Sequence, residues 1–544
     1  MSTLRISGLA SGMDTDLMVE SLMKVERLKV DRFEQNKQIA LWRQEAYNNM
    51  NKLFANFILN TRKNFGLTKT TSTGIALNYS YTSVDYLRKA VSSKEDVASV
   101  TSTSKALNGT FNIEVKQLAT SGSITSAELD NLDDIQLDGM KFRIKGTEDG
   151  QFVTITVKGS TMNDLVKAIN EKKDETKVMA FYDSENKRLF LQSTVTGENS
   201  KIQLSRVSGE DGDEGYKFLE KVRGEGFKKI NGQDAIIQYN GVDLKYSSNN
   251  INFNGLNIVL KAEGKTTISV STNVDGIMEK IEQLINDYNE LIDKVSQAIN
   301  EKRYSQYYPL SQDEKKAMHE DDVKLWEEKA KSGMLSRDEL ITRTLQAIRT
   351  DLYRNVGGVS GSFKNLIEIG ITTESYTRGT TGGKLQIDKE KLRAAIEKDP
   401  EGVMELLFKE PEKLDRADFP DTDEGKRQYE AAERANRRDN GGIFTRVYDN
   451  LIDGMKAIID RAGPGQDADL LRSIKSNILI DFVTSKSSIS DLDREVLNIN
   501  RRIDDLNAQL IRKENAYYAK FANMEKMLQQ MYSQSNWLAQ QFMR

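Results

Sequence analysis

The chain of 544 residues contains no cysteine and a single histidine, His319. Without cysteine it cannot form disulfides, thiolate metal sites or a cysteine nucleophile, and one histidine cannot supply a histidine-based triad. His319 stands beside Glu320, Asp321 and Asp322, so we expect it to be solvated. No group of carboxylates falls in a recognisable catalytic or metal-binding motif. We therefore expect a protein that is not an enzyme and that binds neither a metal nor a cofactor.

A strong net charge and a long apolar run are also absent. The 78 lysines and arginines are balanced by 82 acidic residues, so a formal net charge of -4 gives no basic footprint for nucleic acid. No stretch approaches 18 consecutive apolar residues, and the first residues lack the apolar run of a cleavable secretory signal, so we expect no membrane insertion. The five prolines, at 309, 400, 411, 420 and 464, leave both ends of the chain free for long helices.

What the chain does contain is a long heptad pattern near its C-terminus. Apolar residues recur at seven-residue spacing, as heptad a positions of one helix: Ile489, Val496, Ile503, Leu510, Tyr517, Met524, Met531 and Leu538. The d row begins with three apolar residues and then becomes mostly polar: Leu492, Ile499, Leu506, Lys513, Lys520, Met527, Gln534 and Gln541. Each buried leucine or isoleucine contributes about 1.5–3 kcal/mol. The pattern therefore predicts a permanent seam up to Leu510 and a seam beyond it that becomes ordered only against other subunits. An ordinary core helix is the alternative.

The N-terminal segment predicts a second long helix. Asp14 is the expected N-cap, and Asp16 in the first turn suits the helix dipole. Apolar residues at helical spacing form the expected buried face: Met18, Leu22, Val25, Ile39, Trp42, Ala46, Met50, Leu53 and Phe57. Because this helix has about the same reach as the C-terminal one, we expect the two to pair.

From about residue 70 the pattern changes to strands. Phe111, Ile113 and Val115 alternate as one strand face, and 178–193 reads as a hairpin that turns at Ser-Glu-Asn-Lys. Thr161 and Asp164 form a capping box at the start of a helix that faces a sheet. The sequence thus predicts a multidomain α+β fold in which helical ends enclose a β-rich middle.

Helical patterns return at Asp275, and another helix is expected to start at a Ser336/Glu339 capping box and to stop at Gly357-Gly358. Charged insertions interrupt this part near 301–332 and 410–440, and the sequence assigns them no role. We expect four nested parts: terminal helices ordered on assembly (1–40 and 510–544), a helical leg domain (41–100 and 276–509), an inner β domain (101–127 and 233–275) and an inserted outer β domain (128–232).

Several segments resemble one family. The opening ISGLASGMDTDLMVESLMKVER closely resembles the N-terminal signature of the bacterial flagellar filament-cap family, flagellar hook-associated protein 2. Further segments are similar to the same family: GTFNIEVKQLATSGSITSAEL, TTISVSTNVDGIMEKIEQLINDYNELI, IEIGITTES and GGKLQIDKEKLRAAIEKDPEGVMELLF. The stretch TMNDLVKAINEKKDETKVMAFYDSENKRLFLQS is also similar to the IN motif of flagellins and hook proteins. The resemblance covers nearly everything except the two charged insertions.

The resemblance implies a homo-oligomeric ring at the distal tip of the flagellar filament, where a β-rich plate covers the growing tube and helical legs reach into it. It also implies partners: flagellin, whose subunits fold and insert beneath the ring, the flagellar export apparatus and an export chaperone. The implied location is outside the cell, after secretion through the export channel, and the lack of cysteine suits export in an unfolded state. Two alternatives stay open: an adhesin that binds host or environmental surfaces, and an axial protein at the hook–filament junction.

Overall fold

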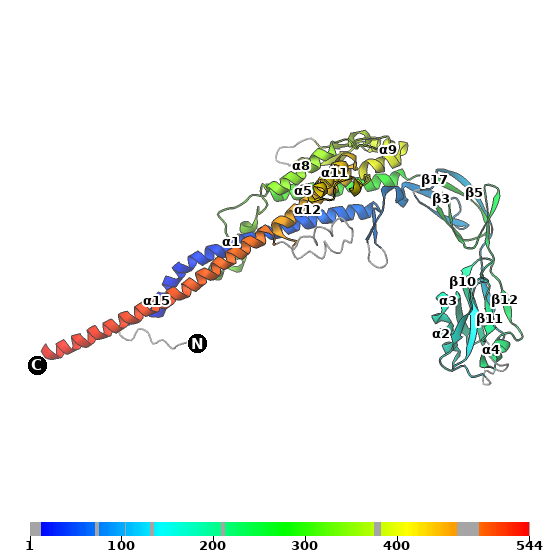
Figure 1. Ribbon diagram of the computed structural model, residues 1–544, viewed down its shortest axis with the longest axis horizontal. Coiled ribbons are helices and arrows are strands. Elements are labelled where there is room, and N and C mark those ends of the chain that lie inside the picture. Colours follow the sequence, from blue (N-terminus) through cyan, green and yellow to red (C-terminus); the bar gives the residue numbers. More distant parts are fainter. Residues whose placement is uncertain are drawn as a thin grey trace. The chain divides into compact units, whose positions relative to one another are not determined.

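The computed structural model describes residues 12, 14–70, 76–103, 105–130, 135–207, 213–374, 382–464 and 489–542. The chain divides into two compact units, one of residues 1–81 with 278–544 and one of residues 82–277. Helices dominate the first unit and strands the second (Figure 1). The predicted multidomain α+β fold, with helical ends and a β-rich middle, is confirmed.

The first unit, which we call the helical unit, is formed from both ends of the sequence. Its helices are α1 (Thr15–Asn64), α5 (Val274–Asn300), α6 (Gln312–Ala317), α7 (Glu320–Lys331), α8 (Glu339–Leu352), α9 (Lys389–Lys398), α10 (Pro400–Phe408), α11 (Asp423–Asn440), α12 (Ile443–Ala462) and α15 (Asp491–Phe542). Two short antiparallel pairs accompany them: β1 (Thr68–Thr70) with β2 (Ala76–Asn78), and β18 (Ile371–Thr373) with β19 (Leu385–Ile387).

The core of the helical unit lies where α1, α5 and α12 meet. Phe54, Tyr288 and Phe444 are fully buried there, and the rings of Phe57 and Tyr448 have their centroids 6.1 Å apart. Aromatic side chains supply much apolar area, and a buried phenol needs a hydrogen-bond partner. Tyr448 Oη donates to Thr61 Oγ1 at 2.8 Å, so this contact holds α12 against the C-terminal half of α1.

Both charged insertions are helical and are attached to this core. The first contains α6 and α7, and Lys331 Nζ lies 2.7 Å from a carboxylate oxygen of Glu45 on α1. The second contains α11, where Arg437 donates to both carboxylate oxygens of Asp449 on α12 at 2.8 and 2.9 Å. Bidentate pairing of this kind fixes geometry as well as charge, so the second insertion has a defined position on α12.

The second unit, which we call the β unit, contains two separate hydrophobic cores. The inner core lies between a five-stranded sheet, β14-β13-β5-β17-β3, and a three-stranded sheet, β15-β16-β4. The strands are β3 (Arg88–Ser92), β4 (Ala98–Ser102), β5 (Gly109–Gln117), β13 (Ala235–Tyr239), β14 (Val242–Tyr246), β15 (Asn250–Phe253), β16 (Leu256–Leu260) and β17 (Gly264–Thr272). Ile113 and Val115 of β5 are buried in this core, as their alternation predicts.

The outer core lies among two further antiparallel sheets, β12-β6-β10-β9 and β11-β7-β8, and three helices. The elements are β6 (Ser121–Thr125), β7 (Lys141–Lys145), β8 (Val153–Thr156), α2 (Met162–Glu171), α3 (Lys173–Thr176), β9 (Val178–Asp183), β10 (Arg188–Thr196), β11 (Gln203–Arg206), α4 (Glu214–Val222) and β12 (Lys228–Ile230). The Thr161/Asp164 capping box at the start of α2 is confirmed, as is the hairpin of β9 and β10.

Three boundaries differ from the sequence prediction. Strands β3 and β4 belong to the β unit, although residues up to 100 were expected in the leg domain. Strand β6 pairs with the outer strands β10 and β12, although residues up to 127 were expected in the inner domain. Helix α8 is capped by Asp338, whose Oδ1 accepts from the amide of Ile341 at 3.1 Å, so the Ser336/Glu339 capping box was wrong. These short strands are rich in serine and threonine, which gives little hydrophobic signal for deciding which sheet they join.

Candidate assembly site

The terminal helices α1 and α15 lie side by side in antiparallel orientation over a long stretch of the helical unit (Figure 1). Two polar contacts fix which residues face each other. Gln44 Nε2 donates to Asp493 Oδ1 at 2.8 Å, and Lys513 Nζ lies 2.6 Å from Glu26 Oε2. We call the end at Gln44 the root of this helix pair and the end at Phe542 its free end. The predicted pairing of the two terminal helices is therefore present in the structure.

On α15 the two predicted heptad rows face α1 near the root. Leu492 is fully buried and Ile503 is 8% exposed. The remaining apolar members as far as residue 524 are half-buried: Val496, Ile499, Leu506, Leu510, Tyr517 and Met524. Ile489 lies before the helix and is exposed, because Ser490 caps α15 by accepting from the amide of Asp493 at 3.1 Å.

On α1 the buried row differs from the predicted one. Val19, Met23 and Val30 are buried, whereas the predicted residues Leu22 and Val25 are exposed. Ile39 and Trp42 are half-buried. The buried row is hard to recognise in the sequence because its next position is the charged residue Glu26. The spacing of residues 19, 23, 26 and 30, which alternates between four and three, is the heptad signal that would have found it.

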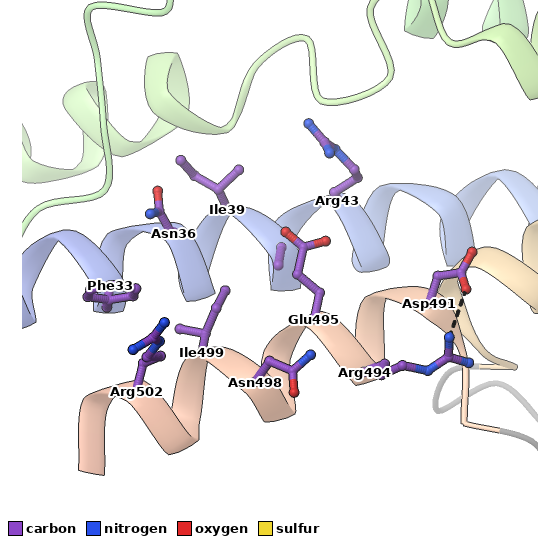
Figure 2. Close-up of a pocket in the computed structure, with 11 residues that line it drawn as sticks. Phe33, Asn36, Ile39, Arg43, Asp491, Arg494, Glu495, Asn498, Ile499 and Arg502 are labelled. Carbon is purple, nitrogen blue, oxygen red and sulfur yellow. Dashed lines mark ion pairs between the residues drawn. The ribbon is translucent and has the colours of Figure 1, made fainter. Parts of the chain in front are cut away.

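An open groove of about 670 Å³ runs between α1 and α15 near the root (Figure 2). Glu495 and Ile499 point from α15 toward α1, whereas Ile39 and Arg43 lie on a side of α1 turned away from α15. Apolar, polar and charged side chains line the groove: Phe33, Asn36, Ile39, Ala40, Arg43, Asp491, Arg494, Glu495, Asn498, Ile499 and Arg502. The two helices leave room beside their seam at this level.

The polar part of the d row has a partner in α1. Lys513 was expected to weaken the seam, and it instead lies against Glu26, whose side chain is only 22% exposed. The hydrogen bond from Lys513 lowers the pKa of Glu26. Burial raises the pKa of the neighbouring Asp31, and the negative charges of Glu34, Asp313 and Glu314 add to that effect. This end of α1 is thus acidic on one side and is paired with a lysine of α15.

Toward its free end α15 extends past α1. With Glu26 opposite Lys513, the first residue of α1, Thr15, lies opposite residues near 524, because both helices rise about 1.5 Å per residue. Five large apolar residues beyond that point are strongly exposed: Met527, Met531, Tyr532, Trp537 and Leu538. Three of them, Met527, Met531 and Leu538, lie in the predicted heptad rows. The distal part of α15 therefore presents an apolar stripe that no described residue of the chain covers.

Among the described residues no cluster of three or more histidine, cysteine, aspartate or glutamate side chains could hold a metal ion. Within the same residues no helix has the combined length and apolar character needed to cross a bilayer.

Family models and known relatives match most of the chain. The model of the flagellar hook-associated protein 2 C-terminus matches residues 232–533, that of the same protein's N-terminus matches 11–122, and that of the flagellin hook IN motif matches 141–195. Flagellar hook-associated protein 2 of Halalkalibacterium halodurans is 27% identical over 587 residues, which cover 99% of this chain and 100% of that protein. The B-type protein of Pseudomonas aeruginosa is 28% identical over 58% of this chain and 65% of its own length.

A solved structure agrees in fold. The crystal structure of the D1-D2-D3 domains of the flagellar cap protein FliD from Escherichia coli is similar to this chain with a TM-score of 0.50 at 21% identity, covering 75% of this chain and 95% of that one. The C-terminal family model alone spans more than half of the sequence, and it includes α5, α12 and most of α15. The chain belongs to the flagellar hook-associated protein 2 family.

Proposed function

We propose that this chain forms a homo-oligomeric ring that caps the distal tip of the flagellar filament and promotes the folding and insertion of exported flagellin. Membership of the family supports the cap role. The observation that carries the assembly part is the overhang of α15. Its distal heptads have apolar a positions, yet Met531 and Leu538 are 64% and 49% exposed. No described residue of the chain covers this stripe, and helices from other chains, either further copies of this chain or flagellin, would bury it.

A second apolar stripe supports contact between copies. Met18, Leu22 and Val25 are exposed on α1, beside the row that faces α15. Ile39 lies two heptads beyond Val25, with Arg32 at the position between them, and it lines the open groove. A helix that packs against two neighbouring helices needs two apolar stripes, one for each neighbour. Under this proposal Leu22 and Val25, which are exposed within one chain, and Ile39 and Trp42, which are half-buried, are assembly residues.

The remaining parts of the proposal follow from the family. The chain would be secreted through the flagellar export channel with the help of an export chaperone, and would act at the filament tip. In this scheme the overhang of α15, beyond about residue 524, gains most of its order on assembly, which is later along the chain than the start at about 510 expected from the sequence. The pairing of α1 with α15 at Glu26 and Lys513 already forms within one chain. The polar character of the distal d row, with Lys520 and Gln534, keeps the free end from forming a permanent seam too early.

The test is to place charges on the overhang without touching the folded core. Met531→Lys/Leu538→Lys should leave the monomer folded, because both side chains are already exposed, but cells should become non-motile and release flagellin into the medium. Gln529→Lys/Asn536→Lys adds the same charge on the opposite face of α15 and is the matched control. Normal filaments with the first variant would contradict a role of this stripe, and normal filaments in cells lacking the whole protein would contradict the cap.

Adhesion is a second candidate, favoured by one observation in the β unit. The outward face of the sheet β12-β6-β10-β9 exposes Met179, Phe181, Phe190 and Ile230. Phe181 and Phe190 are directly opposite in the register of β9 and β10, with ring centroids 6.2 Å apart. Exposed apolar groups gathered on one sheet face are typical of interaction surfaces.

The adhesion test uses this aromatic pair. Phe181→Ser/Phe190→Ser should reduce attachment of cells to surfaces while filament growth and motility continue. Val242→Ser, at another exposed strand position of the β unit, is the control and should leave attachment unchanged. Attachment that survives loss of both phenylalanines would remove this candidate and leave the cap proposal untouched.

A further inference from the structure

We propose that the register of α1 on α15 is locked by two separate devices: the Glu26–Lys513 layer and the C-terminal end of α12. The lock is independent of what the free end binds, so it goes beyond the proposed function. It determines how far α15 extends past α1, and therefore which heptads the overhang presents.

The Glu26–Lys513 pair occupies a seam position on both helices. Glu26 follows Val19 and Met23 in the buried row of α1, and Lys513 follows Leu506 in the d row of α15. An ion pair at a seam position between apolar neighbours is a known means of fixing register, because a slip that brings its charges against apolar side chains leaves them unpaired. The surrounding seam is apolar enough for this rule to apply, since Val30 is buried and Leu510 is half-buried.

The second device lies at the root. Gln44 Nε2 donates to Asp493 Oδ1 at 2.8 Å and to the carbonyl oxygen of Ala462 at 2.7 Å. Ala462 is the last residue of α12, so α12 and α15 follow each other along the same side of α1. The start of α15 is therefore next to the end of α12, and α15 has no space to move toward the root.

The smallest slip that keeps the seams together is one heptad, about 10 Å along the axis. If α15 slides by one heptad toward its free end, Glu26 comes to lie opposite Leu506, and Lys513 comes to lie opposite Val19. Both charges are then unpaired against apolar side chains. A slip toward the root would give Glu26 a new partner, Lys520, so the ion pair alone does not prevent it. The C-terminal end of α12 prevents this slip, because the start of α15 already lies next to it.

The distances agree with one register. Glu26 and Gln44 are 18 residues apart on α1, and Asp493 and Lys513 are 20 residues apart on α15. At a rise of about 1.5 Å per residue these separations are about 27 and about 30 Å, so both contacts form together. In this register we expect Val30 opposite Leu510. After a one-heptad slip Val30 would face Ile503 or Tyr517 instead.

Cysteine pairs can report the register because the chain has no cysteine of its own. Val30→Cys is combined with Leu510→Cys for the native register, with Ile503→Cys for a slip toward the free end, and with Tyr517→Cys for a slip toward the root. Disulfides form only when the Cα atoms come within about 7 Å, so each pair reads one register. Mild oxidation of the dilute full-length protein is followed by mass, which separates internal crosslinks from dimers.

Each pair is compared in three backgrounds: the natural chain, Glu26→Leu/Lys513→Leu, and the reversed pair Glu26→Lys/Lys513→Glu. The natural and reversed chains should give the 30–510 product alone. The leucine pair should remain helical by circular dichroism, because leucine favours helix. Its 30–503 product should increase by about tenfold or more, because the slip no longer leaves charges unpaired.

Three results would overturn the proposal. One is a 30–503 product, or no 30–510 product, in the natural chain. Another is a leucine-pair protein that gives the 30–510 product alone, since the ion pair would then not hold the register. A 30–517 product in any background would show that the end of α12 does not block the root.

Discussion

Asn170 holds the outer edge of β9 through two hydrogen bonds to Ala180. Its Nδ2 donates to the carbonyl oxygen of Ala180 at 3.0 Å, and its Oδ1 accepts from the amide of the same residue at 2.8 Å. β9 is an edge strand, paired only with β10 in its sheet. The asparagine therefore takes the place of a neighbouring strand and keeps the edge from pairing with another chain. It lies in the segment matched by the flagellin hook IN motif.

Asn170→Ala should destabilise the outer core by about 1–3 kcal/mol, because it leaves a buried backbone donor and acceptor without partners. Hydrogen exchange of the β9 amides in the full chain would measure the loss. The control is Asn186→Ala, which removes an exposed hydrogen bond to Asp183 in the following turn and should change little. Equal protection of β9 in Asn170→Ala would show that the edge does not depend on this side chain.

Ile503→Asp should separate α15 from α1, because Ile503 is 8% exposed and a carboxylate there would have no partner. The β unit has its own cores and should keep its unfolding transition. Thermal unfolding of the full chain should then show early loss of part of the helical signal. Asn507→Asp introduces the same charge at an exposed position of α15 and serves as control. A single common transition in Ile503→Asp would contradict independent units.

Hydrogen exchange in the isolated chain should rise along α15. Amides near Leu492 and Ile503, where side chains are buried, should exchange slowly, and those beyond Met531 should exchange fastest. Addition of assembled partner subunits should protect the distal amides. Strong protection beyond Met531 in a dilute monomer would contradict assembly-dependent order.

Acid should weaken the helical unit partly through Glu405. Burial opposes ionisation of this carboxylate, but hydrogen bonds from the amides of Ser360 and Gly361 outweigh burial and lower its pKa below 4.5. A lowered folded-state pKa means that its stabilisation is complete above the unfolded value and is lost as the pH falls through the folded one. Urea midpoints measured between about pH 6 and pH 2 should therefore fall less steeply in Glu405→Gln than in the natural chain. Glu397→Gln, which removes an exposed carboxylate of α9, is the matched control substitution.

Removal of residues 121–232 should delete the outer core and leave the inner one intact. Thr120 and Gln233 already form an antiparallel bridge, with the amide of Thr120 donating to the carbonyl oxygen of Gln233 at 2.9 Å, so the new ends meet without strain. We expect filaments to grow and surface attachment to fall. A deletion of 128–232, cut at the boundary expected from the sequence, would leave Ile124 of the outer core exposed and should aggregate. Loss of filaments with the 121–232 deletion would assign the outer core to assembly.

The sequence determined the fold class, the pairing of the two ends and the heptad rows of α15. These follow from local spacing along one helix, and Val496, Ile503 and Leu510 lie where that spacing puts them because nothing interrupts the helix after Asp491. Tertiary structure decided the other side of the seam. α1 carries two apolar stripes, and only contact with α15 selects the row of Val19 and Met23 over that of Leu22 and Val25. Glu26 breaks the selected row in the sequence, and its partner Lys513 lies far along the chain. A charge that is satisfied by such a distant partner has no local signature, so spacing alone could not place it in the seam.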